Sequence, residues 1–309
     1  MKKFIFVLVT LTTLFLTACS RFSFASLANT ELESSAGTEA NIYIQEVELV
    51  NPFDALHDEV TKLLQEFFNH NSGDGEIGIS YLCLTTGRQI SVNGDQIFRA
   101  QSTIKLAAHM MVAEAVNRGE LAWNQLITIT EDDMPGAYES GFLYFIGYGP
   151  GSQMSLYNLM RYSITHSDNL GFTTVMRRAL PNAHHFGMYF TDAVYHRFFP
   201  GEQASARHRL SPNQQAAILR ELYDGLGVIA GYEIIVNYMM NTEHQNHFIT
   251  DLTRGYVAHI PGWWMGSYYH DSGIFFADKP FILVVYTLDI AQHWRKNQLS
   301  DAIFTLHTK

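Results

Sequence analysis

The sequence predicts an α+β fold from three observations. Segments with strand character lie near both ends of the globular part, the middle region has helical periodicity, and helical segments stand at the two termini of that part. Hydrophobic residues make up 47% of the 309 residues and charged residues 16%, so the chain can bury a sizeable core and bulk disorder is excluded. We expect one antiparallel sheet built from both chain ends, with a mostly helical middle.

Charge and apolar runs restrict the kinds of partner. The formal charge of -10 at pH 7 argues against nucleic acid, because binding of phosphates needs a basic face. A single apolar run, from Phe4 to Leu16, stands out and follows the basic start Met1-Lys2-Lys3. The run is too short for a membrane-spanning helix, which needs about 20 apolar residues. It therefore predicts a signal peptide over residues 1–18.

Leu16-Thr17-Ala18-Cys19 resembles the lipobox of bacterial lipoproteins, in which the peptide is cut before the cysteine and the cysteine is acylated. The resemblance implies an extracytoplasmic, membrane-anchored lipoprotein attached through Cys19. An ordinary signal peptide with an incidental cysteine is the alternative. Without residues 1–18 the chain keeps 18 basic and 30 acidic residues, a formal charge of -12. Because this charge would not attract an anionic bilayer, the lipid would be the anchor.

The rest of the chain divides into a tether and one domain. Residues 19–40 are rich in Ser, Ala, Thr and Glu and are expected to form a flexible tether after the lipid-attachment cysteine. Residues 41–309 contain no further linker or repeat and are expected to form one domain. The second cysteine, Cys83, lies in an apolar run and is expected to be a buried strand thiol. No intramolecular disulfide can form if Cys19 carries lipid.

Hydrophobic periodicity and turn residues predict the elements of this domain in order. The first helix opens at Asn51-Pro52-Phe53-Asp54, and the helix that starts at Ser102 stops before Gly119. Strands are predicted over residues 77–84, 89–92, 255–258, 272–277 and 281–287. Helices are predicted from about residue 51, over 102–118 and over about 291–307, and residues 123–240 are mostly helical.

A serine and a lysine three residues apart form the first candidate site. Ser102 and Lys105 stand at the start of a predicted helix and share one helical face, so the amine can reach the hydroxyl. The helix N-terminus stabilises negative charge on the serine oxygen, and burial disfavours a charged lysine, so Lys105 can accept a proton. The same spacing also fits a helix cap with a surface lysine, so the pair alone is a weak signal.

A second motif, Ser167-Asp168-Asn169, follows an amphipathic helix over 156–166. S-x-x-K followed by S-D-N resembles the penicillin-recognising serine enzymes, the superfamily of class A β-lactamases and penicillin-binding transpeptidases. Residues 127–133, 211–217 and 270–274 resemble further segments of these enzymes in the same order, so the resemblance covers about residues 51–309. It implies a β-lactamase/transpeptidase-like fold that acts on a small-molecule β-lactam or a peptidoglycan-derived peptide.

The resemblance also implies a role for each matching residue. Ser102 would be the nucleophile and Lys105 the activating amine. Ser167 would pass a proton to the leaving nitrogen, and Asn169 would hold the substrate amide and Lys105. The backbone N–H groups of Ser102 and Trp263 would form the oxyanion hole. Asp168 is expected to stabilise the turn.

The third motif departs from the family pattern. Ile260-Pro261-Gly262 stands where the family has Lys-Thr-Gly, whose lysine attracts the substrate carboxylate and supports the serine of S-D-N. Gly262 retains the close backbone approach that the site needs. His259 could supply positive charge only when protonated, and a structural histidine is the preferred reading.

The residue that activates water for deacylation is also in doubt, because residues 170–210 contain no E-x-x-L-N pattern. The acids in this stretch are Asp192 and Glu202. Since Pro200-Gly201-Glu202 resembles the second half of the family loop, Asp192 stands nearest the position of the base. An acyl-enzyme without a placed base would turn over slowly.

Three functions remain open. The leading one is a β-lactamase-type serine acyl hydrolase, the second is a penicillin-binding carboxypeptidase-like enzyme, and the third is a non-hydrolytic receptor for β-lactams or wall fragments. The intact first two motifs favour chemistry, whereas the altered third motif and missing loop glutamate favour the other two functions. Trp263-Trp264 could stack on a ring or sugar or pack in the core. Neither a cofactor nor a metal is expected, since the histidines lack zinc-site spacing, and the protein is expected to act as a monomer.

Overall fold

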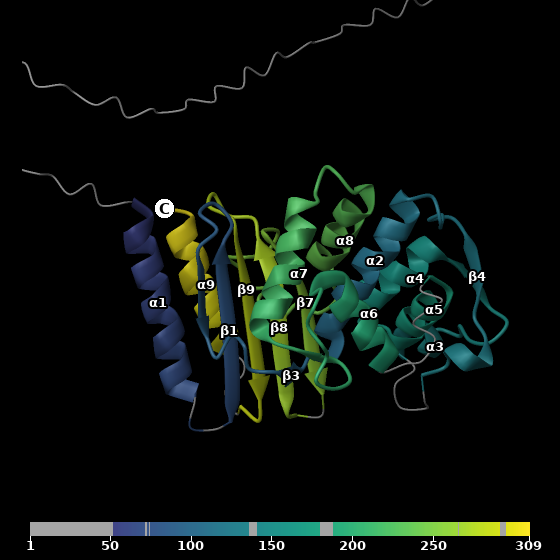
Figure 1. Cartoon of the computed structure of the whole chain (residues 1–309), viewed down its shortest axis with the longest axis horizontal. Helices are drawn as coiled ribbons and strands as arrows, with labels where there is room; N and C mark the ends of the chain where they lie inside the picture. The colour runs from purple at the N-terminus through teal and green to yellow at the C-terminus, as the bar shows by residue number, and fades with distance from the viewer. Residues whose placement is uncertain are drawn as a thin grey trace, which may run out of the picture. The chain divides into compact units, whose positions relative to one another are not determined.

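A five-stranded antiparallel sheet contains strands from both ends of the chain, as predicted (Figure 1). The computed structural model describes residues 52–71, 73, 75–135, 141–179, 188–264, 266–290 and 295–309. The strands are β1 (Glu76–Cys83), β2 (Gln89–Val92), β7 (Val257–Trp264), β8 (Tyr268–Phe275) and β9 (Phe281–Leu288), in the spatial order β2-β1-β9-β8-β7. The register pairs Ile79 with both Val92 and Val285, so residues far apart in sequence meet at the centre of the sheet.

Alternation along the strands divides the core into two layers, because successive side chains point to opposite faces of a sheet. In β9, Phe281, Leu283 and Val285 belong to one layer, and Ile282, Val284 and Tyr286 belong to the other. The first layer is covered by α1 (Pro52–Asn71) and α9 (Lys296–His307). The second is covered by α2 (Lys105–Asn117), α7 (Pro212–Asp224) and α8 (Ala230–Met240). Cys83 is buried in the first layer, as predicted for a strand thiol.

The middle of the chain is mostly helical and extends from the second layer (Figure 1). Its helices are α3 (Gly141–Phe145), α4 (Leu156–Thr165), α5 (Asn169–Ala179) and α6 (Met188–Phe198). Two short ladders accompany them: β3 (Phe98–Arg99) with β6 (Arg209–Leu210), and β4 (Leu126–Thr128) with β5 (Gln153–Ser155). Helix α4 ends at Thr165 and α5 begins at Asn169, so a three-residue turn over residues 166–168 joins them.

Two predicted boundaries differ in ways that concern the site. The predicted helix over 102–118 begins with a 3-10 turn over Gln101–Ile104, and α2 starts only at Lys105. The strand predicted over 255–258 is Val257–Trp264 and includes Pro261 and Gly262. The strand continues through Pro261 because β7 is at the edge of the sheet, where a missing N–H leaves the neighbouring strand's hydrogen bonds intact.

Several predictions concern segments outside the described residues. These are the signal peptide over 1–18, the lipid-attachment Cys19, the tether over 19–40, and the start of the last helix over 291–294. Among the helices that the structure describes, none combines the length and apolar character needed to span a bilayer.

Candidate active site

Ser102 lies in the 3-10 turn that leads into α2, and the surrounding contacts hold this turn firmly. Gln101, directly before it, has a φ of 52°, a left-handed conformation that costs energy in a residue other than glycine. The hydroxyl of Thr103 donates to the Ala100 carbonyl at 2.7 Å and lies 2.6 Å from the Tyr286 hydroxyl of β9. The turn is therefore tied to the sheet while Ser102 itself stays half-buried.

Lys105 begins α2, and its side chain is buried against the turn between α4 and α5. Its Nζ donates to the Ser167 carbonyl at 2.7 Å and to Asn169 Oδ1 at 2.8 Å, and it lies 5.3 Å from the centre of the Phe172 ring. The S-x-x-K and S-D-N motifs are thus brought together, as the resemblance implied. Asn169 holds the lysine amine in place, which is one of the two tasks expected of it.

Ser167 connects the two motifs at their reactive atoms. Its Oγ donates a hydrogen bond to Ser102 Oγ at 2.8 Å, and Lys105 Nζ lies 3.5 Å from the same Ser167 oxygen. Ser167 has a φ of 51°, so both this residue and Gln101 adopt left-handed backbone conformations next to a reactive atom. Such backbone persists only where the surrounding contacts enforce it, and it is typical of functional sites.

Asp168 stabilises the turn through its buried carboxylate. Oδ1 accepts from Gly171 N–H at 2.6 Å at the start of α5, and Oδ2 accepts from Leu143 N–H at 2.8 Å in α3. The first bond caps α5 and the second attaches α3. This is the turn-stabilising role that we expected from the sequence.

Gly262 lies directly against the 3-10 turn that contains Ser102. A Cβ atom at this position would lie 3.1 Å from Ser102 N and 3.1 Å from the Ala100 carbonyl oxygen, so a side chain would require the turn or the strand to shift by a few tenths of an ångström. Trp263 follows in β7 with 57% of its surface exposed. The third-motif segment therefore lies next to Ser102 at Gly262, and the Trp263 side chain is exposed rather than in the core.

The other residues around the third motif are buried. Ile260 is 3% exposed and packs in the core layer that contains α2. His259 Nδ1 lies 3.0 Å from both carboxylate oxygens of Asp271, and both side chains are fully buried. Burial alone would raise the pKa of Asp271, but the charge and hydrogen bond of His259 outweigh it and hold that pKa below its usual value. These contacts agree with the structural reading of His259.

Asp192 is exposed on α6 and borders a cavity of about 620 Å³ that Tyr195, His196 and Glu202 also line. Ser102, Lys105 and Ser167 do not line this cavity. The assignment of Asp192 as deacylation base stays a prediction that no contact in the described part of the chain supports.

Sequence reasoning missed a buried pair beneath the site. His109, one turn after Lys105 on α2, has its Nε2 2.8 Å from the hydroxyl of Ser163, which lies one turn before Ser167 on α4. Both side chains are fully buried, and burial followed by the charge of Lys105 lowers the pKa of His109 to about 3. The signal in the sequence is that His109 lies four residues after Lys105 and Ser163 lies four residues before Ser167, so each is one helical turn from a motif residue.

A model of the beta-lactamase enzyme family matches residues 56–305. The chain belongs to the beta-lactamase enzyme family. No curated protein compared with it matches. Solved structures with the same fold include a beta-lactamase from Chitinophaga pinensis DSM 2588, with a TM-score of 0.66 and 19% identity over 82% of this chain and 98% of that one. These comparisons agree with the predicted superfamily and with a β-lactamase-like α+β fold.

Two further structures have the same fold as this beta-lactamase-family chain. TLA-1 extended-spectrum beta-lactamase has a TM-score of 0.69 and 15% identity, with 82% of this chain and 99% of that one covered. A mutant of PBP-A, in an acyl-enzyme complex with penicillin G, has a TM-score of 0.64 and 19% identity, with 82% and 97% covered. At these identities the likeness concerns the fold.

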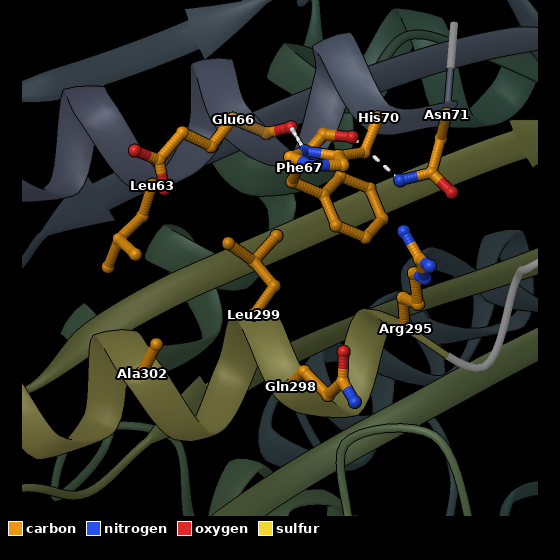
Figure 2. Close-up of a pocket in the computed structure, with 9 residues that line it drawn as sticks. All are labelled: Leu63, Glu66, Phe67, His70, Asn71, Arg295, Gln298, Leu299 and Ala302. Atoms are coloured by element: carbon orange, nitrogen blue, oxygen red, sulfur yellow. Dashed lines mark hydrogen bonds between the residues drawn. The ribbon is translucent and has the colours of Figure 1, made fainter. Parts of the chain in front are cut away.

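Two other kinds of ligand site concern this family member, a metal site and a second cavity. Within the described ranges, no group of three or more His, Cys, Asp or Glu side chains is placed so that it could hold a metal ion. A cavity of about 260 Å³ lies between α1 and α9, where Leu63 and Phe67 face Leu299 (Figure 2). None of the predicted site residues borders it.

Proposed function

We propose that this chain is a β-lactamase-type serine acyl hydrolase in which Ser102 forms an acyl-enzyme with a β-lactam or a related amide. The observation that carries the proposal is the 2.8 Å hydrogen bond between Ser167 Oγ and Ser102 Oγ, with Lys105 Nζ held by the same turn. A serine becomes a useful nucleophile only when a neighbouring base takes its proton, and this arrangement offers one.

Acylation uses these groups in two stages. In molecules whose Lys105 amine is deprotonated, Ser102 Oγ attacks the carbonyl carbon and the Ser102 proton passes to that amine. When the tetrahedral intermediate collapses, the C–N bond breaks and the leaving nitrogen receives a proton from Ser167 Oγ, which Lys105 restores. The N–H groups of Ser102 and Trp263 stabilise the negative oxygen of the intermediate, a contribution of about 3–4 kcal/mol for one such donor. The close packing of Gly262 on Ser102 N supports this pairing.

Deacylation separates the leading candidate from the second one. In a hydrolase, water adds to the ester carbonyl, the bond to Ser102 Oγ breaks, and the oxygen regains its proton. The missing E-x-x-L-N pattern over residues 170–210 favours slow deacylation, as in a penicillin-binding enzyme, because a base must lie near the water that it activates. The likeness to PBP-A, described as an acyl-enzyme complex with penicillin G, supports this second candidate.

Incubation with a fluorescent penicillin tests the proposal. Rapid labelling followed by loss of label is expected for the hydrolase, and a label that persists indicates the penicillin-binding enzyme. Mass spectrometry of the peptide that contains Ser102 locates the attached acyl group. Failure of several β-lactams and activated esters to modify Ser102 would overturn the proposal in favour of a non-hydrolytic receptor.

A further inference from the structure

The wall of the site formed by β7 carries no charged side chain from residue 260 to 264. Ile260 is 3% exposed and Gly262 packs on Ser102 N, so neither offers a hydrogen bond from its side chain. Pro261 lacks an N–H donor as well. Trp263, one residue after Gly262, presents a large ring of which 57% is exposed. This wall suits flat apolar groups, and none of its side chains carries a positive charge to compensate a substrate carboxylate, which is costly to desolvate without a partner.

On the opposite side, next to Ser167, the described basic side chains include the buried Lys105 and the exposed Arg161, whose guanidinium lies over the Tyr162 ring and acts electrostatically on His166. His166 lies directly before Ser167, and its ring is 4.2 Å from the ring of Phe142 in α3, which is 36% exposed. Burial lowers the pKa of His166, and burial likewise lowers that of His244, so both imidazoles favour the neutral form.

An acidic residue near His166 disfavours a bound anion directly, although its charge opposes the effect of burial on the pKa of His166. The backbone N–H of Glu243 donates to the Thr165 carbonyl at 2.8 Å, which attaches it to the end of α4 two residues before Ser167. Its exposed carboxylate acts electrostatically on His166. An anionic group bound nearby would meet this negative charge, and the whole chain has a formal charge of -10.

Lys105 is not available as a receptor for an anionic substrate group. Its Nζ already donates to the Ser167 carbonyl and to Asn169 Oδ1, and it is 4% exposed. We infer that the site selects neutral acyl donors, meaning esters or amides without a carboxylate near the scissile bond, whose flat apolar group stacks on Trp263 or Phe142. This inference rests on the proposed function and adds the chemical class of its substrate.

A matched pair of substrates tests the charge preference. Benzylpenicillin and its methyl ester share the same acyl group and differ in the carboxylate. Each rate of Ser102 acylation is divided by the rate at which the same compound reacts with hydroxide, which removes the difference in intrinsic reactivity. We expect the methyl ester to acylate Ser102 about tenfold faster or more, and the gap to narrow as salt is added. An equal or faster reaction of benzylpenicillin would overturn the inference and leave the proposed function intact.

Trp263→Ala and Phe142→Ala test the stacking. Both variants keep every backbone N–H, so the oxyanion hole is preserved. For the neutral methyl esters, each variant should slow acylation by the phenylacetyl compound about 3- to 10-fold more than it slows acylation by the compound with an acetyl side chain. Leu126→Ala removes another exposed apolar side chain, 65% exposed on β4, and serves as the control. Equal losses for both esters would refute stacking, whereas absence of any Ser102 adduct would refute the proposed function itself.

Discussion

Ser102, Lys105 and Ser167 meet although the two serines are far apart in the sequence. The serine motifs that specify them could be found from the sequence, and so could their order along the chain. Their geometry could not, because it depends on left-handed backbone at Gln101 and Ser167. Neither glutamine nor serine favours a positive φ by its residue type. At these two positions the positive φ accompanies packing of the surrounding segments against Tyr286 and Lys105.

At the residue scale, Ser102→Ala should abolish covalent labelling by a fluorescent penicillin, because no other atom can form the ester. Lys105→Ala should reduce the rate of labelling by several orders of magnitude, since the serine then lacks its proton acceptor. Stopped-flow or gel-based labelling measures both rates, and circular dichroism checks that the variants are folded. Labelling that survives in Ser102→Ala would rule out the proposed nucleophile.

The buried His109 predicts a dependence of stability on pH. Its pKa of about 3 in the folded protein lies below the unfolded value of about 6.5, so the unfolded chain binds more protons between these values. The free energy of unfolding is therefore highest above about pH 6.5 and falls as the solution is acidified towards about pH 3. From pH 7 to pH 5 the loss due to this residue should be about 1–2 kcal/mol.

Urea unfolding of His109→Gln at both pH values isolates this contribution, because glutamine can still bond to Ser163 but does not titrate. On acidification from pH 7 to pH 5, the free energy of unfolding of the variant should fall by about 1–2 kcal/mol less than that of the unaltered protein. Burial also lowers the pKa of His270 to about 3, so some acid sensitivity should remain in the variant. Identical losses in the two proteins would mean that His109 is protonated without unfolding.

At the scale of elements, sequence patterns located β1, β9 and the helices that cover the sheet, because their apolar side chains alternate or repeat clearly. The pattern was less informative for β7, where Pro261 and Gly262 normally interrupt a strand. Only the order of strands explains why β7 continues: it forms the edge, with β8 on one side. Edge position is set by distant segments and cannot be derived from a local pattern.

Substitution within β7 tests what its altered motif does. Ile260→Lys together with Pro261→Thr restores a cation and a hydroxyl, which should increase the acylation rate by benzylpenicillin roughly 10- to 100-fold through a charge-assisted contact. A carboxylate-free ester should react at almost the original rate. Ile260→Met with Pro261→Thr is the uncharged control, and a thermal melt reports the cost of placing lysine where Ile260 is 3% exposed.

The contrast between substrates decides how this double variant is interpreted. Equal gains on both substrates would reflect better folding or packing rather than charge. No gain on either would mean that positions 260 and 261 do not face the substrate.

At the scale of the whole molecule, residues 1–51 precede the described part of the chain, and their role is a proposal from sequence. We propose that they export the protein and that acylated Cys19 anchors it outside the cytoplasm. Cys19→Ser should move the protein from the membrane to the soluble extracytoplasmic fraction, because an acidic surface has no attraction to anionic lipid. Fractionation followed by immunoblotting measures this. A variant that stays with the membrane would show that the apolar run itself is a retained anchor.

The pairing of β1 with β9 has a consequence for how the chain folds. Glu76 pairs in register with Leu288, so this ladder closes a loop that contains the helical middle and the S-x-x-K and S-D-N motifs. Contacts so distant in sequence form slowly, because the entropy of closing the loop is lost before the contacts are gained. During synthesis, which starts at the N-terminus, β1 and β2 are therefore present without β9, the central neighbour of β1, until almost the whole chain has been made. During that interval an apolar strand edge is open to association with other chains, and protection from aggregation matters most then.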